Sequence, residues 1–315
     1  MDKKGFINYL ESKGLAKLTQ KQYLFALQIF FNQAKIEDIQ VTKPDILRHL
    51  EYLKKRKGLQ NVTRKNHLIA LNHYFTYLYE NEQITANPCL LLKIRGTNKK
   101  QLHKIYTPEE LEQLFDAYYQ LFVRNYDDSR CRYEKQRHYS FLYRNRNALI
   151  VSILFNQGTS TSEIEKIQLN DIDLVKAQIT IKGGLRGKER TLPLKATQIG
   201  LFMNYLQNIR PQLLEYQTQE TENLFLALPA INYKTTDNEM NRGIFKPLAE
   251  QIKNIDKQFL NFQQIRASVI TFWIKTQGLR KAQHLAGHRY IFSTEKYQIN
   301  NLDGLIDDIN RLNPF

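Results

Sequence analysis

Three side chains in the last fifth of the chain are of types that can act on a phosphate group. Arg266 is followed 22 residues later by His288, which comes after a glycine, and Tyr297 lies nine residues beyond the histidine. A guanidinium offers a planar fork that matches phosphate, and an imidazole can donate to a phosphate oxygen. A phenol can attack phosphorus once its proton, which ordinarily has a pKa of about 10, has been removed. One tyrosine near one histidine would mean little, but the ordered set in a basic chain is a specific signal.

The spacing resembles that of the tyrosine recombinases, the phage-integrase and Xer-type family of DNA strand-exchange enzymes. The family patterns His-x-x-Arg, Leu-Gly-His and Thr-Thr-x-x-Tyr match Gln263-Gln264-Ile265-Arg266, Ala286-Gly287-His288 and Ser293-Thr294-Glu295-Lys296-Tyr297. The resemblance implies that Tyr297 attacks a DNA phosphate, that Arg266 clamps this phosphate and that His288 donates to a non-bridging oxygen. A 3′-phosphotyrosyl link stores the bond energy, so neither a metal nor another cofactor is expected.

One departure from the family concerns a second phosphate clamp. Family members normally carry an arginine in Gly-x-Arg-x-Ser-Glu, but in residues 158–163 Ser160 stands at that position, and Glu163 matches the acidic residue. A serine brings no charge, and loss of a charged phosphate donor commonly lowers the rate by orders of magnitude. Two arginines precede this loop; Arg146 matches an arginine often seen there in the family, so Arg144 is the freer candidate to replace the clamp.

Two further departures affect proton transfer. Gln263 replaces the family's histidine, and an amide can hydrogen-bond a phosphate oxygen but cannot shuttle a proton. The family's hairpin lysine, the general acid for the departing 5′-oxygen, aligns with Leu185. Lys188 is the first candidate for this role, because a shift of the hairpin turn could place it where the family has its lysine. Lys182 and Arg186 are the next candidates.

Charge and composition agree with a polyanionic partner. The 315 residues suffice for two domains, and 46 Lys+Arg stand against 31 Asp+Glu, a net charge of +15. Residues 1–100 alone hold 18 Lys+Arg and 8 Asp+Glu. Charge would equally suit RNA or a membrane surface, so double-stranded DNA as the partner follows from the resemblance.

The cysteines and the apolar runs bear on location. Cys89 and Cys131 lie far apart without metal-binding spacing, which argues against a disulfide framework or a zinc site. No signal-peptide core or 18-residue apolar run occurs, so we expect a cytoplasmic protein with no membrane span.

The periodicity predicts a mainly α fold with a small antiparallel β-sheet. We assign residues 1–92 to an N-terminal helical core-binding domain, 93–106 to a basic linker and 107–315 to a mixed catalytic domain. The resemblance implies that the two domains close around duplex DNA.

Helix signals in the first domain predict four helices. The first spans Lys3–Ser12, Thr19 caps the second, a capping box of Thr42 and Asp45 opens the third, and the fourth spans 62–81. The basic runs of the first domain serve either as solvated surface or as phosphate contacts. The candidates for DNA binding are Lys54, Lys55, Arg56, Lys57, Arg64 and Lys65.

In the second domain, Thr107 caps a helix that has Glu110 at its third position. A buried helix is predicted over 146–156, and a β-hairpin over 178–182 and 189–194. Between the helix that Thr107 caps and the buried helix, residues 124–141 alternate basic and tyrosine side chains and fit either a nucleic-acid loop or a surface insertion for subunit contact.

The chain ends with one apolar helical face, formed by Leu302, Leu305, Ile306, Ile309 and Leu312. By resemblance this tail docks on a neighbouring protomer in a DNA-bound homotetramer; packing on its own domain is the alternative.

The favoured interpretation is a site-specific DNA recombinase or integrase, of a mobile element or a chromosomal site. Intact Arg266, His288 and Tyr297 favour the enzyme. Ser160 and Gln263 favour an alternative, a recombinase-fold DNA-binding protein that has lost catalysis and acts as an architectural or regulatory factor. A topoisomerase-like relaxase with the same chemistry fits the apolar tail less well.

Overall fold

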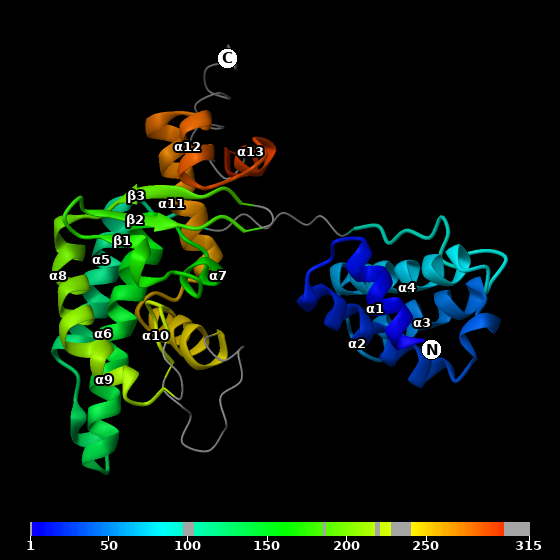
Figure 1. Cartoon of the computed structure of the whole chain (residues 1–315), viewed down its shortest axis with the longest axis horizontal. Helices are drawn as coiled ribbons and strands as arrows, with labels where there is room; N and C mark the ends of the chain where they lie inside the picture. Colours follow the sequence, from blue (N-terminus) through cyan, green and yellow to red (C-terminus); the bar gives the residue numbers. More distant parts are fainter. Residues whose placement is uncertain (1, 97–103, 185–186, 218–220, 228–240, 299–315) are drawn as a thin grey trace, which may run out of the picture. The chain divides into compact units, whose positions relative to one another are not determined.

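The computed structural model describes residues 2–96, 104–184, 187–217, 221–227 and 241–298. The chain divides into two compact units, Met1–Gln101 and Leu102–Phe315 (Figure 1). The first is helical, and the second adds a three-stranded antiparallel sheet to a mainly helical framework. The predicted fold class is thereby confirmed.

Helices with apolar faces turned toward one another build the N-terminal unit. Phe6, Leu27, Phe30, Leu71 and Tyr74 are fully buried in its core. The predicted first helix and the predicted capping box of the third are both confirmed. The helices are α1 (Lys3–Ser12), α2 (Lys17–Ala34), α3 (Lys43–Lys55) and α4 (Asn61–Glu80), with a 3-10 turn at Asp38–Gln40.

The prediction that Thr19 caps α2 is wrong. The helix begins two residues earlier, at Lys17, and its N-cap Ala16 makes no side-chain hydrogen bond. The buried Gln20 side chain instead donates from Nε2 to the carbonyl of Leu15 at 2.8 Å. This bond fastens the start of the helix to the preceding loop, but because Gln20 is the donor it does not cap the N–H groups of the first turn.

Two long helices, α6 (Glu134–Gln157) and α11 (Phe262–Gln277), pack against each other at the centre of the C-terminal unit. Nearly every side chain in the second half of α6 and in the middle of α11 is buried. Thr107 and Glu110 form the predicted capping box of α5. The surrounding helices are α5 (Pro108–Tyr119), α7 (Thr161–Ile164), α8 (Ala196–Asn204), α9 (Arg210–Leu214), α10 (Lys246–Ile255), α12 (Leu279–Leu285) and α13 (Phe292–Gln298).

The sheet lies at one end of α6, on the side where α12 and α13 also lie (Figure 1). Its strands are β1 (Ile172–Asp173), β2 (Gln178–Ile181) and β3 (Arg190–Pro193), in the order β1-β2-β3, and the predicted hairpin is confirmed. Ile179 pairs with Leu192 and Ile181 with Arg190. All four of these side chains are buried, so Arg190 occupies a core-facing position of β3.

The central helix is longer than predicted, because α6 begins at Glu134 rather than near residue 146. Its first turns come from the segment 124–141, for which the sequence left open a nucleic-acid loop or a subunit contact. Arg144 holds the preceding loop on α6: its guanidinium carbon lies 3.9 Å from the ring centre of Tyr126, and Nη2 lies 3.3 Å from a carboxylate oxygen of Asp128. Contacts between a loop and a helix leave no periodic signal in the sequence.

Within the described ranges, every helix is too short or too polar to cross a lipid bilayer.

Candidate active site

Arg266 lies in the second turn of α11, with its guanidinium held by oxygens from three other segments. Nη1 donates to the carbonyl of Gly158 at 2.5 Å and to Oε2 of Glu163 at 3.1 Å, and Nη2 donates to the carbonyl of Ala286 at 2.8 Å. Among the described residues, Nε has no partner. The Nε–Nη2 edge, the side of a guanidinium that makes paired hydrogen bonds to phosphate, therefore keeps donors for a ligand.

Glu163 organises the polar cluster around Arg266. It belongs to the capping box of α7, where its Oε2 accepts from the backbone N–H of Ser160 at 2.7 Å and from the Ser160 hydroxyl at 2.9 Å. Burial alone would raise the pKa of Glu163, but the hydrogen bond from Arg190 and the charges of Arg266 and Arg190 lower it to about 2. The carboxylate is ionised at neutral pH and bonds both guanidiniums.

Arg190 enters the same cluster from β3, a position that the sequence analysis did not assign to the site. Nη1 donates to Oε1 of Glu163 at 2.7 Å, and the side chain is 1% exposed. Its Nε and Nη2 are buried, and neither has a hydrogen-bond partner in the described part of the chain. The signal that could have found it is an arginine in strand alternation with Leu192 and Leu194, because such a side chain faces the core and needs a polar partner there.

The loop before His288 packs closely on Arg190. Gly287 has φ +68°, and a Cβ at this residue would lie 2.5 Å from Nη1 of Arg190 and 2.9 Å from the carbonyl oxygen of Lys188. The backbone N–H of Lys188 donates to the Gly287 carbonyl at 2.8 Å. Glycine is required here both for its left-handed backbone and for the missing side chain, and the contact places the hairpin beside His288.

His288 lies between the cationic cluster and the tyrosine. Its Nδ1 is 2.9 Å from Oγ1 of Thr294, and its ring stacks on Tyr297 with centroids 5.8 Å apart. Burial and the charges of Arg266 and Arg190 lower the pKa of His288 to about 4. The imidazole is thus neutral at physiological pH in the free protein, with one ring nitrogen able to donate.

Tyr297 is half-buried on α13, with its hydroxyl beside Gln263. Nε2 of Gln263 donates to Oη of Tyr297 at 3.0 Å, and Oγ1 of Thr271 donates to the backbone carbonyl of Tyr297 at 3.4 Å. The glutamine that replaces the family's histidine therefore touches the oxygen that the sequence analysis assigned as the nucleophile. A donor at this oxygen stabilises negative charge on it.

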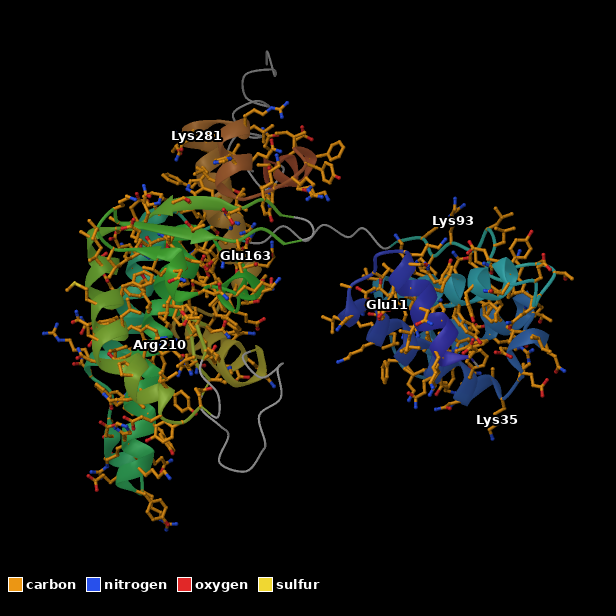
Figure 2. The ribbon with its side chains drawn as sticks, in the orientation of Figure 1. Glu11, Lys35, Lys93, Glu163, Arg210 and Lys281 are labelled. Atoms are coloured by element: carbon orange, nitrogen blue, oxygen red, sulfur yellow. The ribbon has the colours of Figure 1, made fainter. Side chains whose placement is uncertain are left out.

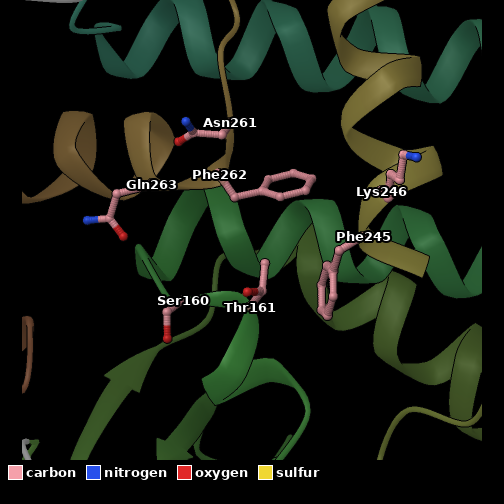
Figure 3. A pocket seen from close by; sticks show the side chains of 7 residues that line it. All are labelled: Ser160, Thr161, Phe245, Lys246, Asn261, Phe262 and Gln263. Atoms are coloured by element: carbon pink, nitrogen blue, oxygen red, sulfur yellow. The ribbon is translucent and has the colours of Figure 1, made fainter. Parts of the chain in front are cut away.

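A cavity of about 340 Å³ adjoins this constellation. Figure 3 shows Gln263 and Ser160 on one side of it and Phe245 and Lys246 on the other. Ser160 lies close to Arg266: it bonds Glu163, which bonds Arg266, and it lines the same cavity as Gln263.

The candidate hairpin lysines differ in their surroundings. Lys188 is exposed, and its backbone is fixed to the loop that carries His288. Lys182 instead lies 3.4 Å from a carboxylate oxygen of Asp171 and donates to Gln168 at 2.5 Å. Arg186 lies outside the described residues. Of the two described candidates, Lys188 is the one whose backbone contacts the loop before His288.

The structure does not bring Arg144 to the site, which corrects that expectation. Arg144 precedes Gly158 by 14 residues on α6, a distance of about 21 Å along the helix axis. Its guanidinium is occupied by Asp128, Tyr126 and the carbonyl of Ser140. A position upstream on the helix that feeds the loop is too far away to replace a side chain at the loop itself.

In the N-terminal unit, the predicted DNA-binding residues lie where α3 ends and α4 begins. Lys54, Lys55, Arg56, Lys57 and Lys65 are exposed, and Lys55 forms an ion pair with Glu51 at 2.7 Å. Arg64 is partly buried and donates from Nε to the carbonyl of Leu50 at 3.0 Å, so it also joins the two helices.

Known families match both units of the chain. The phage integrase family matches residues 134–302, and the phage integrase N-terminal SAM-like domain matches residues 4–85. The tyrosine recombinase XerA of Pyrococcus furiosus is 24% identical, with 98% of this chain and 92% of the relative covered. The tyrosine recombinase XerC of Oceanobacillus iheyensis is 25% identical, with 93% and 89% covered.

Solved structures show the same fold at low identity. The XerH site-specific recombinase bound to a palindromic difH substrate, a post-cleavage complex, has a TM-score of 0.66 at 21% identity, covering 95% of this chain and 81% of the other. The Tn1549 transposon integrase in complex with a circular intermediate DNA has a TM-score of 0.60 at 16% identity, covering 99% of each chain.

Proposed function

Because the chain belongs to the phage integrase family of tyrosine recombinases, we propose that it is a site-specific recombinase that cuts and rejoins double-stranded DNA. The observation that carries the proposal is the meeting of five side chains from α7, α11, α13 and the loop between α12 and α13. Arg266 bonds Glu163, and Gln263 bonds Tyr297, whose ring stacks on His288. Packing of a protein core does not require that the free guanidinium edge of Arg266 and the phenolic oxygen of Tyr297 belong to the same cluster of side chains.

In the proposed reaction, the proton of Tyr297 Oη passes to solvent and the oxygen attacks the phosphorus. The new bond joins Tyr297 to the phosphate at the 3′ end of the cut strand. At the same time the bond between phosphorus and the 5′-oxygen breaks, and this oxygen takes up a proton and leaves as a 5′-hydroxyl. Arg266 and His288 donate to the non-bridging oxygens as negative charge grows on them. Lys188 is the proposed donor of the proton to the 5′-oxygen, and attack by a 5′-hydroxyl on the phosphotyrosyl bond rejoins the strand.

The proposed division of labour follows the chain. Residues 1–92 bind duplex DNA through the basic residues at the end of α3 and the start of α4. Residues 93–106 connect the two domains, and residues 107–315 form the catalytic domain. We also propose that a homotetramer assembles on DNA through the apolar tail residues. These residues, Leu302, Leu305, Ile306, Ile309 and Leu312, lie outside the described part of the chain.

A genome-wide trapping experiment tests this function and identifies the DNA site at the same time. The protein is incubated with nicked fragments of the DNA of its source organism, and fragments that stay bound through denaturation are sequenced. We expect adducts at one defined sequence, with a free 5′-hydroxyl that polynucleotide kinase labels without phosphatase treatment. Adducts linked through the 5′ end would refute the 3′-phosphotyrosyl chemistry.

The uncharged Ser160 and the amide of Gln263 favour a second candidate, a DNA-binding protein on this fold that no longer cleaves. The same experiment separates the two. Sequence-specific DNA recovery by native pull-down, with no adduct under denaturing conditions, would establish the second function and exclude the first.

A further inference from the structure

Two buried arginines share one carboxylate in the candidate active site. Nη1 of Arg190 and Nη1 of Arg266 bond opposite oxygens of Glu163, at 2.7 Å and 3.1 Å. His288 beside them is neutral in the free protein, since its pKa is lowered to about 4 by burial and by these same two charges. These groups together carry one uncompensated positive charge, and a buried unpaired charge is costly unless an anion joins it.

The free donors of the cluster also point to an anion. Each arginine uses Nη1 for the carboxylate. In Arg190, Nε and Nη2 are buried without a partner among the described residues, and the hydrogen bonds of Arg266 to described residues use Nη1 and Nη2 and leave Nε free. Native proteins rarely leave buried N–H groups without an acceptor. Nε and Nη2 together form the edge that bonds two oxygens of one phosphate.

We propose that Arg190 is the second phosphate-binding guanidinium of this site, supplying from β3 the charge that Ser160 does not supply from the start of α7. The inference rests on the proposed function and names a residue for it. Arg190 is buried in the free protein, and Gly287 packs beside its Nη1 and Cδ atoms. The proposal requires that binding of the scissile phosphate next to His288 displaces the Gly287 loop, so that a phosphate oxygen reaches Nε and Nη2 of Arg190.

Cleavage measurements with a rescue variant distinguish this role from a structural one. On the trapped site DNA, Arg190→Gln should lower the single-turnover rate of adduct formation roughly 100- to 1000-fold. Adding Ser160→Arg should recover at least about tenfold of that loss, because the cavity beside Ser160 and Gln263 has room for the longer side chain. A residue that only fastened Glu163 would not be rescued from a different segment.

Arg210→Gln is the matched control. Arg210 is buried to a similar degree, but among the described residues it donates only to the backbone carbonyls of Thr221 and Asn223. Figure 2 shows it away from Glu163. Its cleavage rate should stay within about threefold of wild type at temperatures where the variant is folded. Equal losses in Arg210→Gln and Arg190→Gln, or no rescue by Ser160→Arg, would overturn the proposal.

A second measurement needs no DNA site. The Tm of the full chain is followed against inorganic phosphate at constant ionic strength in wild type, Arg190→Gln, Arg266→Gln and Arg210→Gln. The phosphate-dependent rise should shrink in Arg190→Gln and Arg266→Gln and persist in Arg210→Gln. An undiminished rise in Arg190→Gln would refute the role of Arg190. If wild type forms no adduct while the rise depends on Arg190, the proposed cleavage fails and the phosphate site stands.

Discussion

At the scale of single residues, the positive charge of the site and its neutral hydrogen-bond donors come from different side chains. Arg266 and Arg190 bring fixed positive charge, and Glu163 holds both in place. His288 and Gln263 bring neutral donors next to the phenolic oxygen of Tyr297. Gln263, which replaces the family's histidine, keeps a hydrogen bond to the hydroxyl of Tyr297, and we expect the substitution to remove proton transfer at that position.

Tyr297→Phe should abolish covalent attachment to DNA while leaving DNA affinity nearly unchanged. The substitution removes one hydroxyl, which in the free protein bonds only Gln263 among the described residues. Denaturing gels measure the adduct and fluorescence anisotropy measures binding on the same DNA. An adduct formed by this variant would mean that another residue is the nucleophile.

His288 should make the C-terminal unit less stable as the pH falls from about 6.5 to 4. Its pKa is about 4 in the folded protein and about 6.5 in an unfolded chain, so the unfolded state binds more protons in this window. Urea unfolding followed by Trp273, the single tryptophan and part of α11, reports on this unit alone. His288→Asn should flatten the pH dependence, and an identical slope in the variant would contradict the lowered pKa.

At the scale of elements, the site depends on where short segments end. The capping box of α7 fixes Ser160 and Glu163, and the loop between α12 and α13 fixes His288. The hairpin turn reaches that loop through the bond from Lys188 to Gly287. Movement of any one of these ends would separate the guanidiniums from the phenol.

Gly287→Ala should impair both folding stability and cleavage. The left-handed backbone costs a residue with a Cβ about 1–2 kcal/mol, and the methyl group would displace Arg190. Gly14→Ala is the matched control, because Gly14 has φ +69° and a Cβ added there would meet no atom within 4 Å. Both variants should lose stability in urea unfolding, but only Gly287→Ala should cleave DNA more slowly when folded. Equal cleavage by the two would show that the Gly287 contact is unimportant for the reaction.

At the scale of the whole molecule, most of the net positive charge lies in the first 100 residues, whereas the described residues of the candidate active site belong to the C-terminal unit. Residues 1–100 hold 18 of the 46 Lys+Arg residues and only 8 of the 31 acidic ones. Under the proposed function, we therefore expect long-range attraction to phosphate to come mainly from this part and the cleavage chemistry from the C-terminal unit.

Replacing Lys54, Lys55, Arg56 and Lys57 together with alanine should flatten the salt dependence of DNA binding. Each phosphate neutralised contributes about −0.9 to the slope of log K against log salt. Anisotropy titrations over a salt series measure the slope, and Tyr297→Phe, which keeps the basic surface, should match wild type. A slope unaltered by the fourfold replacement would show that these side chains are only solvated surface.

The sequence by itself determined the features that depend on neighbours in the chain. The capping boxes at Thr42 and Thr107, the hairpin strands and the ordered Arg266, His288 and Tyr297 follow from side-chain chemistry and spacing within a few residues. The family resemblance rested on the same local patterns and is confirmed.

Tertiary structure decided which arginine joins Arg266. Arg144 was the nearer choice along the chain, yet the rise of α6 carries it about 21 Å from Gly158. Arg190 lies 30 residues beyond Ser160 in the sequence, but its register opposite Ile181 turns it inward, where Glu163 meets it at 2.7 Å. A helix separates residues in proportion to their spacing, whereas strand pairing and packing bring distant ones together, and only the folded chain combines the two.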